Sequence, residues 1–243
     1  MAGKILMNKQ GKRFLIKDLD KDMHTQFGFF NKKDFKKKSG SKIKSNTKNE
    51  FTVFEPFFID LYKKIKRGAQ IIPLKDIGLI VSETGVNNES KVVDAGSGSG
   101  ALACFLANFV KEVVSYEIRD DFIKIVKNNI EFLNLKNIKV KKKDVYEKID
   151  EKEVDLIVLD LPEPWKASDN AKKALKAGGF LVSYSPTIPQ VMDFVNDIRK
   201  NKDFAYIKTS EIIEREWDVD DRKVRPRSQA IGHSGFITFA RKI

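Results

Sequence analysis

The glycine-rich segment of this chain reads Val92-Val93-Asp94-Ala95-Gly96-Ser97-Gly98-Ser99-Gly100-Ala101-Leu102. Apolar residues lead into glycines at alternate positions and continue after them, which is typical of a strand, a tight turn and a helix in succession. Glycine lets the chain turn sharply, lets its backbone approach a ligand, and lets the helix pack closely. Alone the pattern is weak, since it also satisfies the fingerprint of dinucleotide-binding folds.

Helical and strand segments alternate along the sequence after Gly68. The patterns predict strands at residues 91–94, 112–117, 138–140, 154–160 and 180–184, and helices at residues 76–84, 101–110, 119–133, 165–175 and 188–200. Such alternation predicts an α/β fold, in which helices cover both faces of a parallel sheet. Residues 205–217 and 232–241 resemble strands with no helix between them, so an antiparallel C-terminal hairpin is expected to close the sheet.

The first 58 residues have a different texture. Short apolar bursts are separated by clusters of Gly, Asn, Asp and Lys, which predicts a small all-β domain. Apolar residues at helical spacing in 56–67 predict a short linking helix. We therefore expect a small basic β domain at residues 1–66 and a larger α/β domain at residues 67–243.

Most of the positive charge lies in this first part of the chain. The formal net charge is +12, and residues 1–68 hold 18 Lys and Arg against 7 Asp and Glu. The densest run is 31–44, where Lys36, Lys37 and Lys38 are adjacent. Lysines can simply coat a small domain, and an anionic membrane is a second candidate, but the run lacks the apolar helical stripe that membrane binding needs. RNA or DNA is the favoured partner.

Composition excludes several other classes of protein. A chain of 243 residues with 41% hydrophobic residues can bury a sizeable core. No apolar run is long enough for a membrane span, and the N-terminus does not resemble a secretory signal, so we expect a cytoplasmic protein without a membrane partner. One cysteine, Cys104, and two histidines are too few for a disulfide or a zinc site, so no metal is expected.

Acidic residues follow three successive predicted strands. Asp94 precedes the glycines, Glu117 ends the next strand, and Asp144 follows the third. A carboxylate at position 94 would repel a pyrophosphate but attract an amino-acid ammonium group, which favours S-adenosylmethionine over a nicotinamide dinucleotide. Glu117 could accept from both ribose hydroxyls and Asp144 from an adenine amino group. Each acid could instead cap a turn, but together they outline one crevice at the carboxyl edge of the sheet.

The fourth strand ends in Asp160-Leu161-Pro162-Glu163-Pro164-Trp165. Asp160 would project into the crevice beside the methyl donor, and the prolines stiffen the loop that holds the acceptor. We predict that Asp160 is the catalytic residue. The alternative is that Asp160 caps the next helix while Trp165 belongs to the core.

Several segments together resemble the tRNA (adenine-N1)-methyltransferase family that acts on position 58, including its archaeal branch that acts on positions 57 and 58. The matching segments are 67–70, Lys75-Asp76, 95–101, 116–119, 160–165, 179–183, 215–217, Arg225-Pro226 and 232–236. The glycine loop is shared with all class I methyltransferases, whereas 160–165 and 232–236 are more specific. One departure is Pro73-Leu74, where the family often has a ring followed by proline.

The resemblance implies a Rossmann-like class I methyltransferase fold, a small N-terminal β domain and a homotetramer. It also implies that Asp160 contacts both the methyl donor and the target adenine. The predicted cofactor-binding residues are Gln70, Asp94, Ala95, Gly96, Ser97, Gly98, Ser99, Gly100, Ala101, Leu102, Glu117, Asp144, Val145 and Asp160.

The implied reaction is methyl transfer from S-adenosylmethionine to N1 of adenine in the T-loop of tRNA. Trp165 and His233, with Lys36, Lys37 and Lys38, are the candidates for contact with the RNA. Tyr184 is a weaker candidate, since a place in the sheet core explains it better. A class I methyltransferase for another RNA or a protein, and a non-catalytic RNA-binding protein, are the alternatives.

Overall fold

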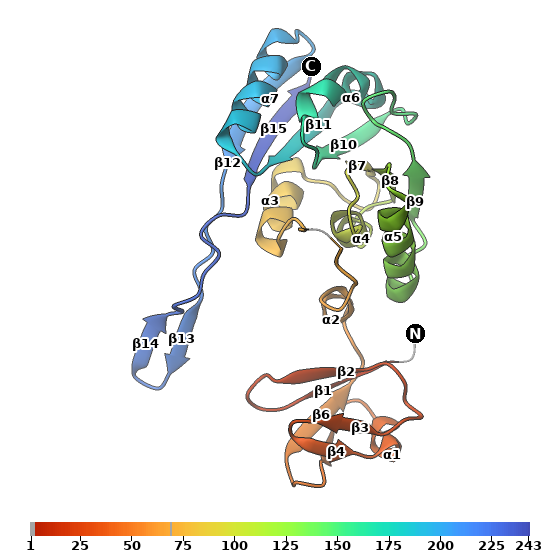
Figure 1. Cartoon of the computed structure of the whole chain (residues 1–243), viewed down its shortest axis with the longest axis vertical. Helices are drawn as coiled ribbons and strands as arrows, with labels where there is room; N and C mark the ends of the chain where they lie inside the picture. Colours follow the sequence, from red (N-terminus) through yellow and green to blue (C-terminus); the bar gives the residue numbers. More distant parts are fainter. Residues whose placement is uncertain (1–2, 69) are drawn as a thin grey trace. The chain divides into compact units, whose positions relative to one another are not determined.

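The computed structural model describes residues 3–68 and 70–243. The chain divides into two compact units, Met1–Ile65 and Lys66–Ile243, called unit 1 and unit 2 below (Figure 1).

Unit 1 is built around a four-stranded antiparallel sheet in the order β2-β1-β6-β5. Its elements are β1 (Lys4–Met7), β2 (Arg13–Ile16), β3 (Met23–Thr25), β4 (Gly28–Phe30), α1 (Lys32–Phe35), β5 (Ser41–Lys44), β6 (Glu50–Phe54) and α2 (Phe58–Tyr62). β3 and β4 pair with each other as a separate hairpin. The apolar bursts of the sequence form the core, in which Phe30, Phe35 and Phe51 are fully buried.

Unit 2 contains a seven-stranded mixed sheet in the order β12-β15-β11-β10-β7-β8-β9. Its strands are β7 (Lys91–Ala95), β8 (Glu112–Glu117), β9 (Ile138–Lys142), β10 (Val154–Leu159), β11 (Leu175–Ser185), β12 (Phe204–Ser210) and β15 (Phe236–Lys242). Strands β9, β8, β7, β10 and β11, neighbours in that order, are parallel. β15 lies between β11 and β12 and runs antiparallel to both. The predicted α/β fold with an antiparallel C-terminal pair is therefore confirmed.

Helices cover both faces of this sheet. They are α3 (Leu74–Thr84), α4 (Ala101–Leu106), α5 (Asp120–Leu133), a 3-10 turn η1 (Pro164–Ala167), α6 (Ser168–Ala174) and α7 (Ile188–Lys200). Successive side chains of β10 enter opposite cores: Ile157 and Leu159 pack with α6 and α7, and Leu156 and Val158 pack with α3 and α4. The uninterrupted apolar run of β10 follows from burial on both faces.

A long arm leaves the sheet between β12 and β15. It carries the hairpin of β13 (Trp217–Asp220) and β14 (Lys223–Pro226), which forms a sheet of its own (Figure 1). The two strands predicted at 205–217 and 232–241 extend too far into the arm. In the structure, β12 ends at Ser210 and β15 begins at Phe236. Gly235, directly before β15, packs closely against Tyr184, since a Cβ there would lie 2.5 Å from the Tyr184 ring.

Other boundaries also differ from the predictions. The linking helix at 56–67 is reduced to α2, and the helix predicted at 101–110 ends at Leu106. Asn137 Nδ2 donates to the carbonyl oxygens of Ala107 and Val110 at 2.8 and 3.0 Å, which holds this segment in a turn. Cys104 is buried in α4, and burial raises the pKa of its thiol to about 12.

Among the described residues, no helix is long and apolar enough to cross a membrane. No cluster of three or more potential metal-ligating side chains occurs among them.

Candidate functional site

The glycine loop that follows β7 is fixed by backbone hydrogen bonds to its neighbours. The backbone N–H groups of Gly96 and Ser97 both donate to the carbonyl oxygen of Tyr116, at 3.2 and 3.1 Å. The backbone N–H of Asp160 donates to the carbonyl oxygen of Ala95 at 2.9 Å. The loop thus joins the ends of three adjacent strands.

Gly96 allows the closest approach within this loop. Its φ angle is +86°, and a Cβ at this position would lie 2.1 Å from the carbonyl oxygen of Asp160. Any other residue would displace either the loop or the start of the Asp160 segment. The glycine is therefore required for packing as well as for the turn.

Asp94 lies at the end of β7 and is buried. Its Oδ2 accepts a hydrogen bond from Ser115 Oγ at 2.7 Å, and Ser115 also bonds to Ser97 in the glycine loop. Burial raises the pKa of Asp94 to about 6, and nearby Glu117 acts in the same direction. The hydrogen bond from Ser115 opposes this rise.

Glu117 is held as an acceptor at the end of β8. Its Oε1 accepts from the backbone N–H groups of Ile118 and Arg119, at 2.8 and 3.0 Å, and its Oε2 accepts from Gly98 N–H at 3.0 Å. The bond to Gly98 ties this carboxylate to the glycine loop. Each oxygen can accept more than one bond, so capacity for a ligand remains.

Asp144 and Val145 form a turn after β9. Asp144 Oδ1 accepts from the backbone N–H of Tyr146 at 2.8 Å. Asn170 Nδ2, from α6, donates to the carbonyl oxygens of Val145 and Tyr146 at 3.0 and 2.9 Å. Val145 is itself buried in the core, so only its backbone could reach a ligand.

Asp160 lines a narrow cavity with the glycine loop. The lining residues are Gln70, Ile71, Ile72, Asp94, Gly96, Ser97, Gly98, Ser99, Ala101, Leu102 and Asp160. Within the described ranges, the Asp160 carboxylate has no hydrogen bond or ion pair. Burial and the nearby Asp94 raise its pKa to about 7. Two carboxyl groups thus lie at one cavity, in an environment that disfavours their negative charge.

Two side chains hold the loop that follows Asp160. The backbone N–H of Glu163 donates to Tyr146 Oη at 3.2 Å, and Gln190 Nε2, from α7, donates to the carbonyl oxygen of Pro162 at 2.9 Å. Tyr146 therefore connects the Asp144 turn to the loop that carries Asp160.

A buried polar network lies at the base of the arm. Asp76 accepts hydrogen bonds from Lys75 Nζ at 2.6 Å, from Ser234 Oγ at 2.7 Å and from Tyr184 Oη at 3.2 Å. Lys75 Nζ also donates to the carbonyl oxygen of Ile212. Segments 75–76, 179–184 and 232–236, far apart in the sequence, meet here.

The predicted RNA-contacting residues do not gather at the cavity. Trp165 packs beside α7 and lines a different, open cavity with Asp193, Asn196, Asp197 and Lys200. Tyr184 is buried in the core. His233 bonds to Glu211 at 2.6 Å and to the carbonyl oxygen of Pro186 at 2.9 Å, and the Glu211 carboxylate raises its pKa.

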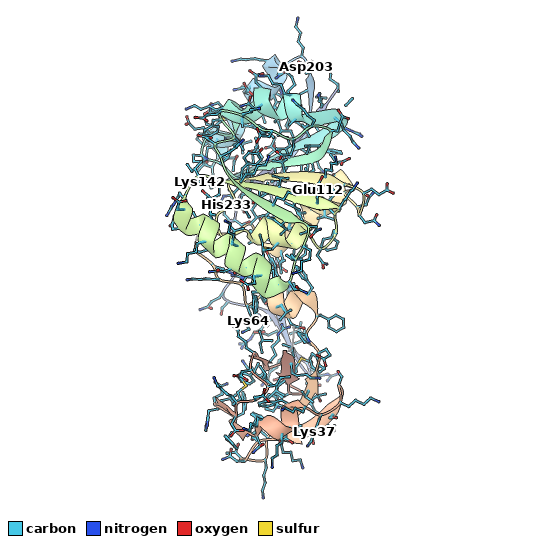
Figure 2. The ribbon with its side chains drawn as sticks, turned by 90° about the vertical axis from the view of Figure 1, so that its right-hand side faces the viewer. Lys37, Lys64, Glu112, Lys142, Asp203 and His233 are labelled. Carbon is cyan, nitrogen blue, oxygen red and sulfur yellow. The ribbon has the colours of Figure 1, made fainter. Side chains whose placement is uncertain are left out.

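The three adjacent lysines lie at the surface of unit 1. Lys36 pairs with Asp20 and Lys37 pairs with Asp34, whereas the Lys38 ammonium has no ion pair among the described residues. Figure 2 shows Lys37 on this surface.

Sequence reasoning missed several residues of the site. Ile71 and Ile72 line the cavity but carry no motif. Asn129 Nδ2 donates to the carbonyl oxygens of Ser99 and Lys66, both at 2.8 Å, and so fixes the glycine loop from α5. The available signal was an amide within the apolar stripe of a helix, which predicts a buried polar contact.

This fold and this cavity define a class I S-adenosylmethionine-dependent methyltransferase architecture, as predicted. Residues 63–225 match the family described as tRNA methyltransferase complex GCD14 subunit. The chain belongs to this family, which confirms the resemblance drawn from the sequence.

Three known proteins are similar over nearly the whole chain. The tRNA (adenine(57)-N(1)/adenine(58)-N(1))-methyltransferase TrmI of Methanocaldococcus jannaschii is 39% identical, over 99% of this chain and 95% of the relative. A crystal structure named as an S-adenosylmethionine-dependent O-methyltransferase from Thermotoga maritima has a TM-score of 0.90 and 30% identity, over 99% and 92%. The structure of TrmI from Aquifex aeolicus, named as a tRNA methyltransferase, has a TM-score of 0.85 and 25% identity, over 100% and 97%.

Proposed function

We propose that this protein transfers a methyl group from S-adenosylmethionine to N1 of adenine at position 58 of tRNA. Position 57 is included because the full-length relative from M. jannaschii is named for both positions. The observation that carries the proposal is the Asp160 carboxylate, which lines the glycine-loop cavity and has no partner among the described residues.

The residues of the cavity fit the cofactor. Ser99 Oγ is buried and has no hydrogen-bond partner among the described residues, so a donor or acceptor remains for a ligand. Two acidic side chains, Asp94 and Asp160, suit a molecule that carries a sulfonium and an ammonium group. We infer that residues 95–102, Gln70, Asp94, Glu117 and the Asp144-Val145 turn hold it. When bound, S-adenosylmethionine supplies an electrophilic methyl group.

The chain must then hold the adenine in line with this methyl group at near-attack distance. As N1 attacks, positive charge spreads to the exocyclic amine. The Asp160 carboxylate, accepting from that amine, would stabilise the charge more in the transition state than in the ground state. No base is required, because N1 has a lone pair and no proton to lose.

The partners of the reaction follow from the same proposal. A base in folded RNA must be turned out to reach the cavity. Lys36, Lys37 and Lys38 would contact RNA phosphates, and we place the reaction in the cytoplasm with its tRNA substrate. We propose a homotetramer, as the family resemblance implies. The arm exposes Trp217, Val219 and other apolar side chains, a surface that suits contact with further copies of the chain.

A labelling experiment tests the proposed function. The protein is incubated with labelled S-adenosylmethionine and unmodified tRNA, and the nucleosides are then separated and the modified position is mapped. The expected product is 1-methyladenosine at position 58 or 57. Label in another nucleoside, or in protein, would instead favour a different class I methyltransferase.

The Asp160→Asn variant tests the role of the carboxylate. It should bind S-adenosylmethionine within about tenfold of the parent and lose about 10²-fold or more in rate, as when one transition-state contact is removed. Near-normal turnover would reject Asp160 as the catalytic residue.

A further inference from the structure

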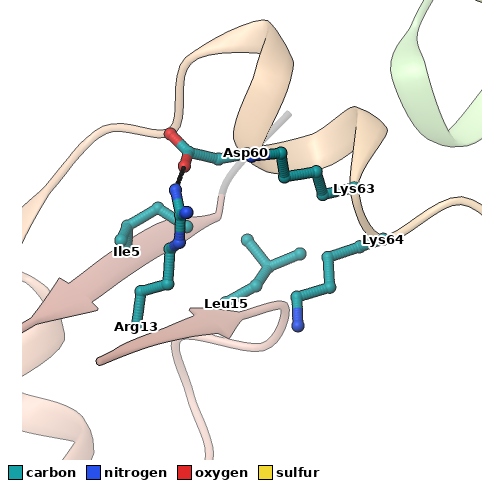
Figure 3. Close-up of a pocket in the computed structure, with 6 residues that line it drawn as sticks. All are labelled: Ile5, Arg13, Leu15, Asp60, Lys63 and Lys64. Atoms are coloured by element: carbon teal, nitrogen blue, oxygen red, sulfur yellow. Dashed lines mark hydrogen bonds and ion pairs between the residues drawn. The ribbon is translucent and has the colours of Figure 1, made fainter. Parts of the chain in front are cut away.

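A separate cavity lies within unit 1, where β1 and β2 meet the end of α2. It is lined by Ile5, Arg13, Leu15, Asp60, Lys63 and Lys64 (Figure 3). Its volume is about 130 Å³. Since a water molecule occupies about 30 Å³ in the liquid, this space is comparable to a few waters and accommodates a phosphate group.

The carboxylate in this cavity is already engaged within the protein. Asp60 Oδ1 accepts from Arg13 Nη1 at 3.3 Å, as Figure 3 shows. Its Oδ2 accepts from the backbone N–H of Phe57 at 3.1 Å, at the start of α2. The negative charge of Asp60 therefore neutralises the positive charge of Arg13 and is not paired with either lysine of the cavity.

The two lysines are not balanced in this way. Among the residues that the structure describes, the ammonium groups of Lys63 and Lys64 have no hydrogen bond or ion pair. Arg13 still has N–H groups beyond the one that Asp60 accepts. The cavity thus has two uncompensated positive charges and spare guanidinium donors, which together suit an anion.

The rest of the lining favours an anion that is covalently attached to a less polar group. Ile5 and Leu15 give the cavity an aliphatic wall beside its charges. A phosphodiester flanked by ribose matches this combination. An acidic protein segment matches the charge too, but the excess of 18 cationic over 7 acidic side chains in residues 1–68 favours a polyanion.

We propose that this cavity binds a backbone phosphate of the RNA substrate through Lys63, Lys64 and Arg13. RNA as the ligand rests on the proposed function. The cavity is separate from the three adjacent lysines, and it supplies a phosphate contact of fixed position, because Asp60 holds the Arg13 guanidinium in place.

The test compares two double variants of the full chain that lose equal charge. Lys63→Gln with Lys64→Gln alters the cavity, whereas Lys9→Gln with Lys44→Gln alters exposed lysines elsewhere in unit 1. Affinity for unmodified tRNA is measured by filter binding from low to moderate salt. The cavity variant should reduce the slope of log affinity against log salt by about one to two, and the matched variant by clearly less.

Kinetics separate this proposal from the proposed function. The cavity variant should raise the KM for tRNA severalfold while the kcat and the affinity for S-adenosylmethionine stay unchanged. Equal slopes for the two variants would overturn the cavity proposal while leaving the methylation reaction intact. A loss of affinity for a poly-glutamate peptide with unchanged tRNA binding would overturn it too, since the anion would then be a protein carboxylate. Absence of 1-methyladenosine with the parent protein would count against the proposed function instead.

Discussion

Asp94 and Asp160 have pKa values of about 6 and 7, well above the ordinary value near 4. The folded protein therefore binds more protons than the unfolded chain between pH 4 and pH 7. These two groups add most to stability below pH 4, and this contribution is lost as the pH rises through 6 and 7. A cationic ligand should lower both pKa values again, since it stabilises the ionised form of each carboxyl group.

We therefore expect S-adenosylmethionine binding near pH 6.5 to release on the order of one proton. Titration calorimetry in two buffers of different ionisation enthalpy measures this number. The Asp160→Asn variant should release fewer protons under the same conditions. Binding heats that do not depend on the buffer would show that neither carboxyl group changes its protonation.

Gly96 gives a second prediction at this scale. In Gly96→Ala, the new methyl carbon would meet the Asp160 carbonyl oxygen at 2.1 Å, and the φ of +86° would be strained. We expect a loss of about 1–3 kcal/mol of stability and a larger loss of cofactor affinity. Chemical denaturation and calorimetry measure the two quantities. Gly85→Ala, also at positive φ but with open space around it, is the control that carries backbone strain without the clash.

The elements of the sheet differ in how far the sequence could predict them. β7, β8 and β10 were found because each is a short apolar run buried on both faces. The β13–β14 hairpin was missed because all but one of its side chains are exposed, so no alternation marks it. The acids of the site were predictable since each lies at the end of a strand or just after it, whereas the Asp76 network joins segments whose proximity only the fold creates.

Tyr146 connects two elements of the site, and its hydroxyl can be removed alone. In Tyr146→Phe, the Glu163 N–H loses its acceptor while the Asp144 turn keeps its backbone bond. We expect the kcat to fall by about tenfold, as for one lost hydrogen bond, with the KM for S-adenosylmethionine within about twofold of the parent. Steady-state kinetics with each substrate varied measure both.

A purely structural role for Tyr146 would give a different pattern. Lower thermal stability with an unchanged kcat would contradict the coupling. Tyr206→Phe is the matched control, since the Tyr206 hydroxyl bonds to Thr209 in β12.

At the scale of the whole molecule, the exposed arm bears on how many copies of the chain assemble. Trp217, Val219 and Val224 are 51%, 71% and 57% exposed, an unusual apolar content for a projecting hairpin. If further copies of the chain cover it, Val219→Lys with Val224→Lys should lower the mass measured by light scattering. Lys223→Ser, on the same hairpin, should leave the mass unchanged. Equal masses for all three proteins would contradict assembly through the arm.

The position of β15 has a consequence for biosynthesis. β12 is the edge strand of the sheet in the described part of the chain and is hydrogen-bonded to β15, which comprises residues 236–242. Residues 236–242 must therefore be synthesised before β12 can acquire this neighbour. The strand at this flank of unit 2 stays unpaired while the whole intervening arm is made, and its pairing belongs to the late steps of folding.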